Sequence, residues 1–392
     1  MMTNCWENFR AQMPVAQNWA YLDHAAVAPL PLPTVKAIRN WCDQALNDGA
    51  TDWTAWYRRA EQVRAFASQI INASPAEISL IPSTTAGINL VTEGFPWQPG
   101  DNVVTLDSEF PSNRYPWLNL AHRGVETRVV PTDQGRVDLN RIAEHCDQRT
   151  RIVSLSWIGY SSGWRIDLAA AATMAHDQNS LLFVDAIQGL GVFPIDVKTT
   201  QIDFLAADGH KWLLGPEGAG IFFTRIEHLD LLRPTGVGWH SVKNAFEFSH
   251  DQFEMRADAA RYEGGSRNMT GFLGLAASLE LLTEQGLRSD VSPLAERILA
   301  IAERASTRLA ACGARVFPRP PIDHQSGIVT FEVPEVEPLQ VRRACLDDKI
   351  AVSCRGGGVR ISPHAYNSDE DIDRMISTIQ KMIIPSRGQN ND

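Results

Sequence analysis

Two residues that could carry chemistry each stand just beyond a short apolar run. Lys211 closes the segment Asp208-Gly209-His210-Lys211 after the run 204–207, and Asp185 directly follows the run 181–184. Both runs have the length of buried strands in a parallel sheet, and ligands bind beyond the carboxyl ends of such strands. At that place a lysine amine can form a Schiff base, and an aspartate can hold a protonated ring nitrogen. Apolar surroundings would lower the pKa of the lysine and make its amine a better nucleophile.

Thr84, Thr85 and Gln188 could complete such a site. The threonines lie between the expected strand Ile78–Ile81 and an expected helix. Hydroxyl and backbone N–H groups at such a place bind a phosphate, and they also serve as helix caps. Gln188 follows Asp185 closely, so its amide can turn back and donate to a ring oxygen. With the lysine and the aspartate, these residues predict a site for pyridoxal 5'-phosphate.

Phe110 and Arg360 each allow two interpretations. Phe110 follows the expected strand Asn102–Leu106. It could stack on a flat cofactor ring, although an aromatic residue at such a place is more often part of the core. Arg360 has apolar neighbours on both sides in the expected strand Gly358–Ile361, so its charge needs a partner. A substrate carboxylate bound in bidentate fashion and a structural ion pair are both suitable partners.

The composition excludes several classes of function. A chain of 392 residues with a formal net charge of −10 shows no basic face for a nucleic acid. No apolar stretch has the length of a signal peptide or of a membrane span. The six cysteines show no metal or redox spacing, so we expect no metal and a cytoplasmic protein with free thiols. The glycines near Lys211 do not form a dinucleotide fingerprint, which disfavours a dehydrogenase.

Short apolar runs alternate with amphipathic ones along most of the chain. We expect strands at Ile78–Ile81, Asn102–Leu106, 127–130, 151–156, 181–184, 203–207 and Gly220–Thr224, and helices that include 33–46, 54–71, 87–93, 139–146 and 168–178. After residue 271 the pattern changes to a long helical region, 271–311, then to strands at 326–333, 349–353 and Gly358–Ile361 and a last helix at 369–382. This order predicts an α/β fold with a large, mostly parallel-sheet domain, 18–286, and a smaller α+β domain from 1–17 and 287–392.

Three motifs together resemble the class V aminotransferase family of fold-type I pyridoxal-phosphate enzymes, which includes cysteine desulfurases, isopenicillin N epimerase-like proteins and kynureninases. They are Asp185-Ala186-Ile187-Gln188, Gly209-His210-Lys211, and the segment from Val359-Arg360 to Tyr366-Asn367. The resemblance implies a small amino-acid-like substrate and a homodimer with active sites at the subunit interface. It implies that Lys211 forms the Schiff base with the cofactor, that Asp185 contacts its ring nitrogen and that Gln188 contacts its ring hydroxyl. It places Thr84, Thr85 and His210 near the cofactor's phosphate and Arg360 at the substrate carboxylate. It also implies that the segment ending at Ser266 contacts the phosphate of the partner subunit.

Two departures from the family pattern concern the reaction. Cysteine desulfurases usually carry a histidine where Phe110 stands, and phenylalanine can stack but cannot move a proton. They also carry a nucleophilic cysteine on a loop before the substrate arginine. Cys354 is the one candidate here, and it stands too close to Arg360 for a long mobile loop, so a packing role is expected. Asp208 replaces a frequent serine and should point away from the phosphate.

The residues predict the cofactor better than the reaction, because one core supports several reactions at Cα. We expect transamination or epimerisation-type chemistry on an amino acid or an amine with a carboxylate, with Lys211 as the proton shuttle. The alternative is a cysteine desulfurase or another carbon–sulfur lyase. A regulator that binds a metabolite without turnover is disfavoured, because pure binding does not need the pair of Lys211 and Asp185.

Overall fold

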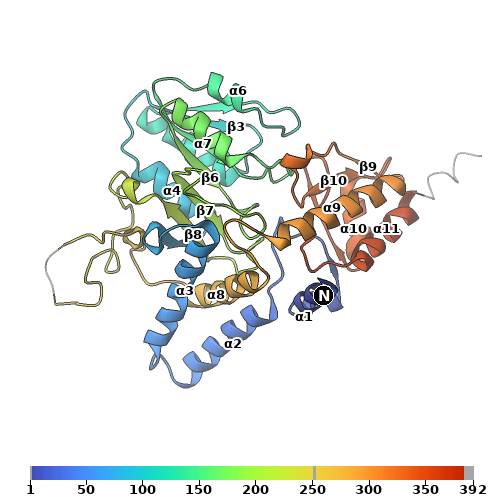
Figure 1. Ribbon diagram of the computed structural model, residues 1–392, viewed down its shortest axis with the longest axis horizontal. Coiled ribbons are helices and arrows are strands. Elements are labelled where there is room, and N and C mark those ends of the chain that lie inside the picture. Colours follow the sequence, from blue (N-terminus) through green and yellow to red (C-terminus); the bar gives the residue numbers. More distant parts are fainter. Residues whose placement is uncertain (1, 250–252, 384–392) are drawn as a thin grey trace, which may run out of the picture.

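The computed structural model describes residues 2–249 and 253–383, and it is built around a seven-stranded sheet (Figure 1). The strand order is β2-β8-β7-β6-β5-β3-β4. The strands are β2 (Ile78–Ile81), β3 (Asn102–Leu106), β4 (Glu126–Val130), β5 (Thr150–Ser156), β6 (Leu181–Asp185), β7 (Phe204–Asp208) and β8 (Gly220–Thr224). In this sheet β8 runs opposite to the other six strands, so its pairings with β2 and β7 are antiparallel and all other pairings are parallel. The predicted mostly parallel α/β fold is confirmed.

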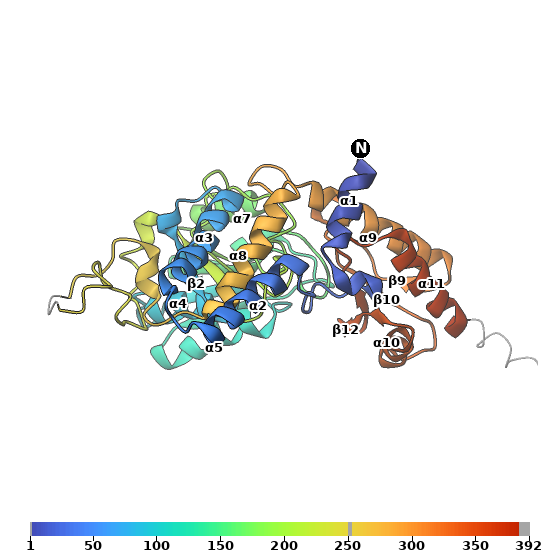
Figure 2. The same ribbon diagram turned by 90° about the horizontal axis from the view of Figure 1, so that it is seen from below.

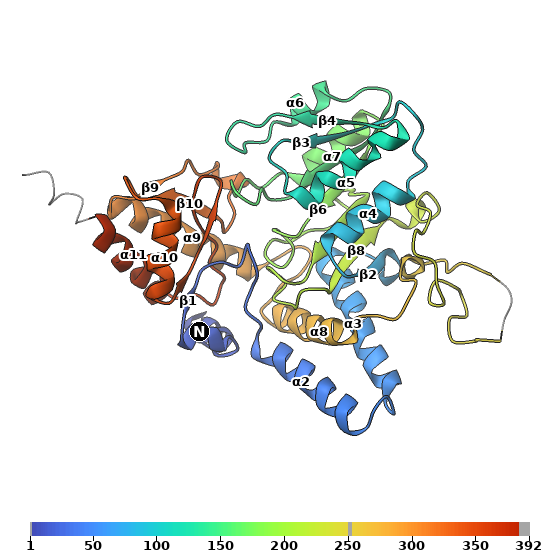
Figure 3. The ribbon, with the colours of Figure 1, turned by 180° about the vertical axis from the view of Figure 1, so that it is seen from behind.

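Apolar side chains cover both faces of the sheet, as its continuous apolar strands require. One face packs on α4 (Thr84–Gly94) and α5 (Tyr115–Asn119), seen from behind in Figure 3. The other packs on α3 (Trp53–Ile71), α7 (Leu168–Asp177) and α8 (Met269–Glu284). Neighbouring strand residues alternate between these layers: Val103 and Phe204 face the first, and Val104 and Leu205 the second. Helices α2 (Leu32–Asn47) and α6 (Leu139–Glu144) complete the outer shell.

A smaller unit packs beside the large one (Figure 2). Its four-stranded antiparallel sheet has the order β12-β13-β10-β9. Its elements are α9 (Pro293–Ala311), β9 (Arg315–Val316), β10 (Val329–Glu332), α10 (Pro338–Asp347), β11 (Ile350–Ala351), β12 (Ser353–Arg355), β13 (Gly358–Ile361) and α11 (Asp369–Ile383). The expected strand 349–353 is divided, because β11 pairs with β1 (Ala20–Tyr21) whereas β12 pairs with β13.

The expected helical region 271–311 is two helices, α8 and α9. Gly286 lies between them with φ +90°, a left-handed conformation that glycine adopts without strain. Ser292 then caps α9 through its hydroxyl, and Pro293 occupies the first turn, where its missing N–H is not needed. These residues end one helix and start the next, so the chain can turn from the large unit into the small one.

The N-terminal segment from α1 to just past β1 packs on both units. Phe9 and Met13, from α1 (Met2–Ala11) and just after it, belong to the apolar core of the large unit, whereas Ala20 and Leu22 belong to that of the small unit. The predicted domain limits therefore stay a prediction. Residues 1, 250–252 and 384–392 of the predicted domains lie outside the described residues. No described helix is long and apolar enough to cross a membrane.

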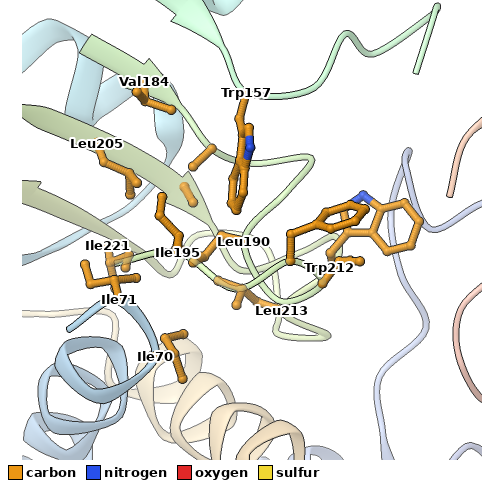
Figure 4. Close-up of a cluster of buried hydrophobic side chains, with 14 of the residues drawn as sticks. Ile70, Ile71, Trp157, Val184, Leu190, Ile195, Leu205, Trp212, Leu213 and Ile221 are labelled. Atoms are coloured by element: carbon orange, nitrogen blue, oxygen red, sulfur yellow. The ribbon is translucent and has the colours of Figure 1, made fainter. Parts of the chain in front are cut away.

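The core beneath the sheet also anchors the segment after β7. Figure 4 shows Trp212 and Leu213 turned into a cluster with Trp157, Leu190 and other apolar side chains. Trp212 and Leu213 are each 1% exposed. Their burial fixes the backbone immediately after Lys211, so the lysine is held at the end of the sheet.

Candidate active site

A cavity of about 260 Å³ lies at the carboxyl ends of β6 and β7 and at the start of α4. Eight of the nine predicted site residues line it: Thr84, Thr85, Phe110, Asp185, Gln188, His210, Lys211 and Arg360. The parallel strands of the large sheet end at the same edge, and this brings residues that follow different strands to one place. Ser266 is the exception. It lines a separate cavity with Trp53, Tyr57 and Trp239, so its expected contact with a partner's phosphate stays a prediction.

Lys211 is only 8% exposed. Burial lowers its pKa to about 8, although the negative charge of Asp185 opposes that shift. Its Nζ lies 5.6 Å from the centre of the Phe110 ring. The turn before it needs Gly209, because a Cβ there would lie 2.6 Å from the carbonyl oxygen of Ala219. The site thus holds an amine with an appreciable neutral fraction near neutral pH.

Asp185 is buried at the end of β6, and burial raises its pKa to about 6. The backbone N–H of Ile187 donates to its Oδ1 at 3.1 Å. A buried carboxylate with a raised pKa gains from a cation placed against it. A protonated pyridine nitrogen would be such a cation, so Asp185 fits the predicted cofactor.

Gln188 is held at both ends of its amide. Trp212 Nε1 donates to its Oε1 at 2.8 Å, and its Nε2 donates to the carbonyl oxygen of Ala25 at 3.0 Å. An amide nitrogen carries two hydrogens. The second hydrogen of Gln188 is available to an acceptor in the cavity, as the ring hydroxyl of the cofactor would be.

The start of α4 offers donors for a phosphate. The hydroxyl of Ser83 caps the helix by accepting from the N–H of Ala86. Thr84 Oγ1 accepts from the N–H of Asp208 at 2.9 Å, which leaves its own hydrogen free to donate. Gly87 brings the helix close to the sheet, because a Cβ there would lie 2.6 Å from that of Ala206. Free donors at a helix start fit a phosphate, which completes the fit to pyridoxal phosphate.

Asp208 lines the same cavity, but one of its oxygens is used locally. Its Oδ1 accepts from the N–H of Gly209 at 2.7 Å. Its Oδ2 lies 3.1 Å from His210 Nδ1, without the alignment of a hydrogen bond. The carboxylate thus lies beside the imidazole of His210, a relationship that the sequence did not predict.

Arg360 forms a structural ion pair, which is one of the two roles that the sequence allowed for it. It is 1% exposed, its Nη2 lies 3.2 Å from Oδ1 of Asp23, and its Nη1 donates to the carbonyl oxygen of Tyr160 at 2.7 Å. Its Nε has no hydrogen-bond partner. Burial lowers the pKa of Arg360 and raises that of Asp23, so desolvation outweighs the attraction for both partners. The ion pair is present, and the guanidinium still faces the cavity.

Glu109 was not predicted as part of the site. Its carboxylate is buried behind Phe110 and accepts hydrogen bonds from the N–H and the hydroxyl of Ser156 and from Asn113 Nδ2. Burial raises its pKa to about 7, and the charge of Asp185 adds to the shift. A charged residue three positions after an apolar strand, next to Phe110, was the available signal in the sequence.

Cys354 does not line the cavity. In β12 the side chains alternate, and both neighbours of Cys354 face the site: Ser353 donates to Asp23 at 2.8 Å, and Arg355 lines the cavity. Cys354 therefore points to the opposite side, where it is close enough to influence the charge of buried Cys345. Burial raises the pKa of Cys354, which disfavours a thiolate.

Comparisons with known proteins bear on the whole chain. The family model for class V aminotransferases matches residues 20–375. A probable cysteine desulfurase of Methanothermobacter thermautotrophicus is 30% identical, over 96% of this chain and 98% of that protein. The uncharacterized aminotransferase YcbU of Bacillus subtilis is 27% identical, over 95% and 97%.

The cysteine desulfurase CsdA of Escherichia coli is similar in both sequence and structure. Its sequence is 30% identical, over 96% of this chain and 97% of that protein. Its crystal structure superposes with a TM-score of 0.85 at 27% identity and covers 96% of this chain and 98% of that one.

Proposed function

Because the chain belongs to the class V aminotransferase family and has pyridoxal phosphate as its cofactor, we propose that it cleaves a carbon–sulfur bond in a cysteine-type amino acid by elimination. The named relatives that are cysteine desulfurases favour sulfur chemistry, which was the alternative, over transamination or epimerisation.

One observation carries the choice of elimination over desulfuration. Among the described residues that line the cavity there is no cysteine, and Cys354 faces away on β12. A desulfurase passes the sulfur to a thiolate of its own chain. Without a thiol at the cavity, the sulfur has to leave with its bonding electrons.

When bound, pyridoxal phosphate supplies an electron sink that makes the proton on the substrate's Cα acidic. Asp185 keeps the ring nitrogen protonated, and Gln188 orients the ring oxygen. Arg360 binds the substrate carboxylate and so fixes the orientation of Cα. Phe110 can pack on the ring but cannot carry a proton, which leaves that task to Lys211.

The proposed reaction balances without an oxidant. Lys211 Nζ takes the proton from Cα, the electron pair of that bond forms the Cα–Cβ double bond, and the Cβ–S bond breaks with its electrons on sulfur. The leaving thiolate takes up a proton. The released 2-aminoacrylate reacts with water to give pyruvate and ammonia.

The products of cysteine decide between the possible reactions. Elimination yields pyruvate, ammonia and sulfide in equal amounts, and Lys211→Ala abolishes all three. Alanine with protein-bound sulfur would instead identify a desulfurase. Transfer of the amino group to a 2-oxo acid, without loss of sulfur, would identify an aminotransferase. Cys354→Ser is the matched control, because elimination does not use that thiol.

We propose further that the enzyme acts as a cytoplasmic homodimer. Trp239, which lines the cavity that contains Ser266, contacts the rings of Phe246 and Phe248, and the three side chains are between 37% and 82% exposed. An exposed aromatic surface of this kind is typical of a protein interface. Sedimentation equilibrium should give twice the chain mass, and Phe248→Glu should lower it; a monomeric wild-type protein would contradict the proposal.

A further inference from the structure

A second cavity, of about 660 Å³, lies between the large and small units. On one side it is bounded by the loop after β5, at Ser161 and Ser162, and on the other by β9, β10 and the segment 317–320. The units also touch beside it, because the N–H of Arg165 donates to the carbonyl oxygen of His324 at 2.8 Å. The second cavity is more than twice as large as the one at Lys211.

The two cavities share a wall. Tyr160 and Arg355 line the first, and the next residue of each pair, Ser161 and Gly356, lines the second. Arg360 donates to the carbonyl oxygen of Tyr160, so the wall stands at the end of the first cavity that holds the substrate carboxylate. The phosphate-binding start of α4 is at another end. A chemical group that extends from the first cavity into the second at this wall would therefore be part of the substrate and not of the cofactor.

The side of the wall that faces the second cavity is made of small residues. Gly356 and Gly357 form the turn between β12 and β13 with φ of +58° and +83°, and a Cβ at Gly356 would lie 3.2 Å from that of Ser161. The hydroxyl of Thr330 donates to the carbonyl oxygen of Ser161 at 3.0 Å. On the side of the second cavity the contact between the loops thus rests on glycine, serine and a single hydrogen bond, whereas the side chains of Tyr160 and Arg355 line the side of the first cavity.

The lining of the second cavity suits an uncharged, apolar group. Phe317, Pro318, Pro320 and Ile328 supply apolar surface. The charged residues there are already paired. Arg315 and Glu332 form an ion pair across β9 and β10, and Arg319 donates to Glu303 at 2.5 Å and to Gln325 at 3.1 Å. A charged ligand would have to displace these partners, whereas an apolar one only replaces water.

We infer that the second cavity is the subsite for an apolar substituent on the substrate's sulfur, so that the enzyme prefers S-alkyl- or S-aryl-substituted cysteines to cysteine. The inference rests on the proposed elimination and names its substrate class. The leaving group is then an organic thiolate, R–S⁻, in place of hydrogen sulfide; the other products stay pyruvate and ammonia. The large volume beyond the wall explains why the first cavity can be small.

Steady-state cleavage of L-cysteine and of S-benzyl-L-cysteine by the loaded enzyme tests the inference. The wild-type kcat/KM should be at least about tenfold higher for S-benzyl-L-cysteine, since burial of an apolar group discriminates by that order. Ser162→Trp fills the second cavity and should remove this preference while cysteine cleavage stays within about twofold. Phe317→Ala removes apolar surface from the same cavity and should also lower the preference.

A matched variant and a binding measurement separate the outcomes. Ser377→Trp places the same side chain on α11, outside both cavities, and should leave the preference unchanged. Equilibrium titration of the cofactor's absorbance should show weaker binding of S-benzyl-L-cysteine to Ser162→Trp. Cleavage of cysteine without the preference, or equal losses for both substrates in Ser162→Trp, overturns the inference alone. If no sulfur amino acid is cleaved, the proposed function and the inference both fail.

Discussion

Arg360 and Asp23 form a buried ion pair in which Nη2 and Oδ1 are 3.2 Å apart, although 337 positions separate them along the chain. The pair holds the guanidinium at the cavity before a substrate carboxylate arrives. Asp23 is also the acceptor for Ser353, so a small network orients the arginine. Orientation before binding lowers the entropic cost of positioning the substrate.

Asp23→Ala should destabilise the protein and make its stability depend on ligand. It leaves the charge of Arg360 buried without a carboxylate, which costs about 3–5 kcal/mol. A ligand carboxylate can replace the lost partner, so saturating substrate analogue should restore more thermal stability in the variant than in the wild type. Ser353→Ala, which removes only a hydrogen bond, should cost about 1 kcal/mol. Equal ligand-induced shifts in Asp23→Ala and the wild type would refute this role of Asp23.

Lys211 should be the residue that captures the cofactor, and capture should depend on pH. The neutral amine is the nucleophile, and its pKa is lowered to about 8 in the protein without cofactor. The rate of cofactor uptake should therefore rise as the pH increases through about 8 and then level off. Borohydride should bleach the visible band and leave the label on the peptide that contains Lys211. A label on any other lysine would contradict the assignment.

Asp185→Asn should bind the cofactor but lose most turnover. The amide cannot stabilise the positive charge of the pyridine nitrogen, so the electron sink weakens. We expect a fall in kcat of about 100-fold or more, with cofactor affinity changed much less. Glu109→Gln is the matched control, because it removes a neighbouring buried carboxylate that does not line the cavity. Near-normal activity of Asp185→Asn would remove Asp185 from the mechanism.

The strands of the large sheet and the residues at its carboxyl edge could be predicted from the sequence. Most strands of the large sheet are short, largely apolar runs in which nearly every residue is buried, so composition and length identify them, whereas β4 at the sheet edge is partly exposed. Parallel strands end at one edge, which is why Asp185 and Lys211 could be placed together. The sequence also contains the signals that divide the region 271–311 into two helices, namely Gly286 and the Ser292-Pro293 pair. We expected one helical region because the apolar pattern is similar on both sides of these residues.

Long-range polar pairing could not be predicted. Nothing near Asp23 indicates that it meets Arg360, because their contact depends on how the small unit packs against the chain before α2. Ser266 lies in a separate cavity, and its expected contact with the phosphate of a partner subunit stays a prediction. Alternation in β12 likewise decides that Cys354 faces away, and that required knowledge of its pairing with β13.

His24 should make the protein sensitive to acid. It is fully buried beside Tyr366 and Ser362, and burial lowers its pKa to about 4. The unfolded chain takes up a proton near pH 6.5 and the folded one only near 4, so stability is lost as the pH falls through this window. The loss from this residue amounts to about 3 kcal/mol at most.

Denaturant unfolding between pH 4 and 7 measures the effect. His24→Gln should show a weaker dependence on pH than the wild type in this range, whatever its stability at pH 7. His122→Gln, at an exposed position, should follow the wild-type dependence. His364 is buried next to His24 and its pKa is also lowered, so part of the dependence remains in the His24 variant. Identical slopes for His24→Gln and the wild type would rule out the proposed origin.

Cys354→Ser should retain most of the activity on a sulfur-containing substrate. The thiol lies on the face of β12 opposite to Ser353 and Arg355, burial raises its pKa, and the two-residue turn that follows ties it to β13. Movement of the thiol into the cavity would require this strand pairing to break. Rapid alanine formation from cysteine, lost in Cys354→Ser and accompanied by labelling of Cys354 with sulfur, would instead establish a persulfide mechanism and displace elimination.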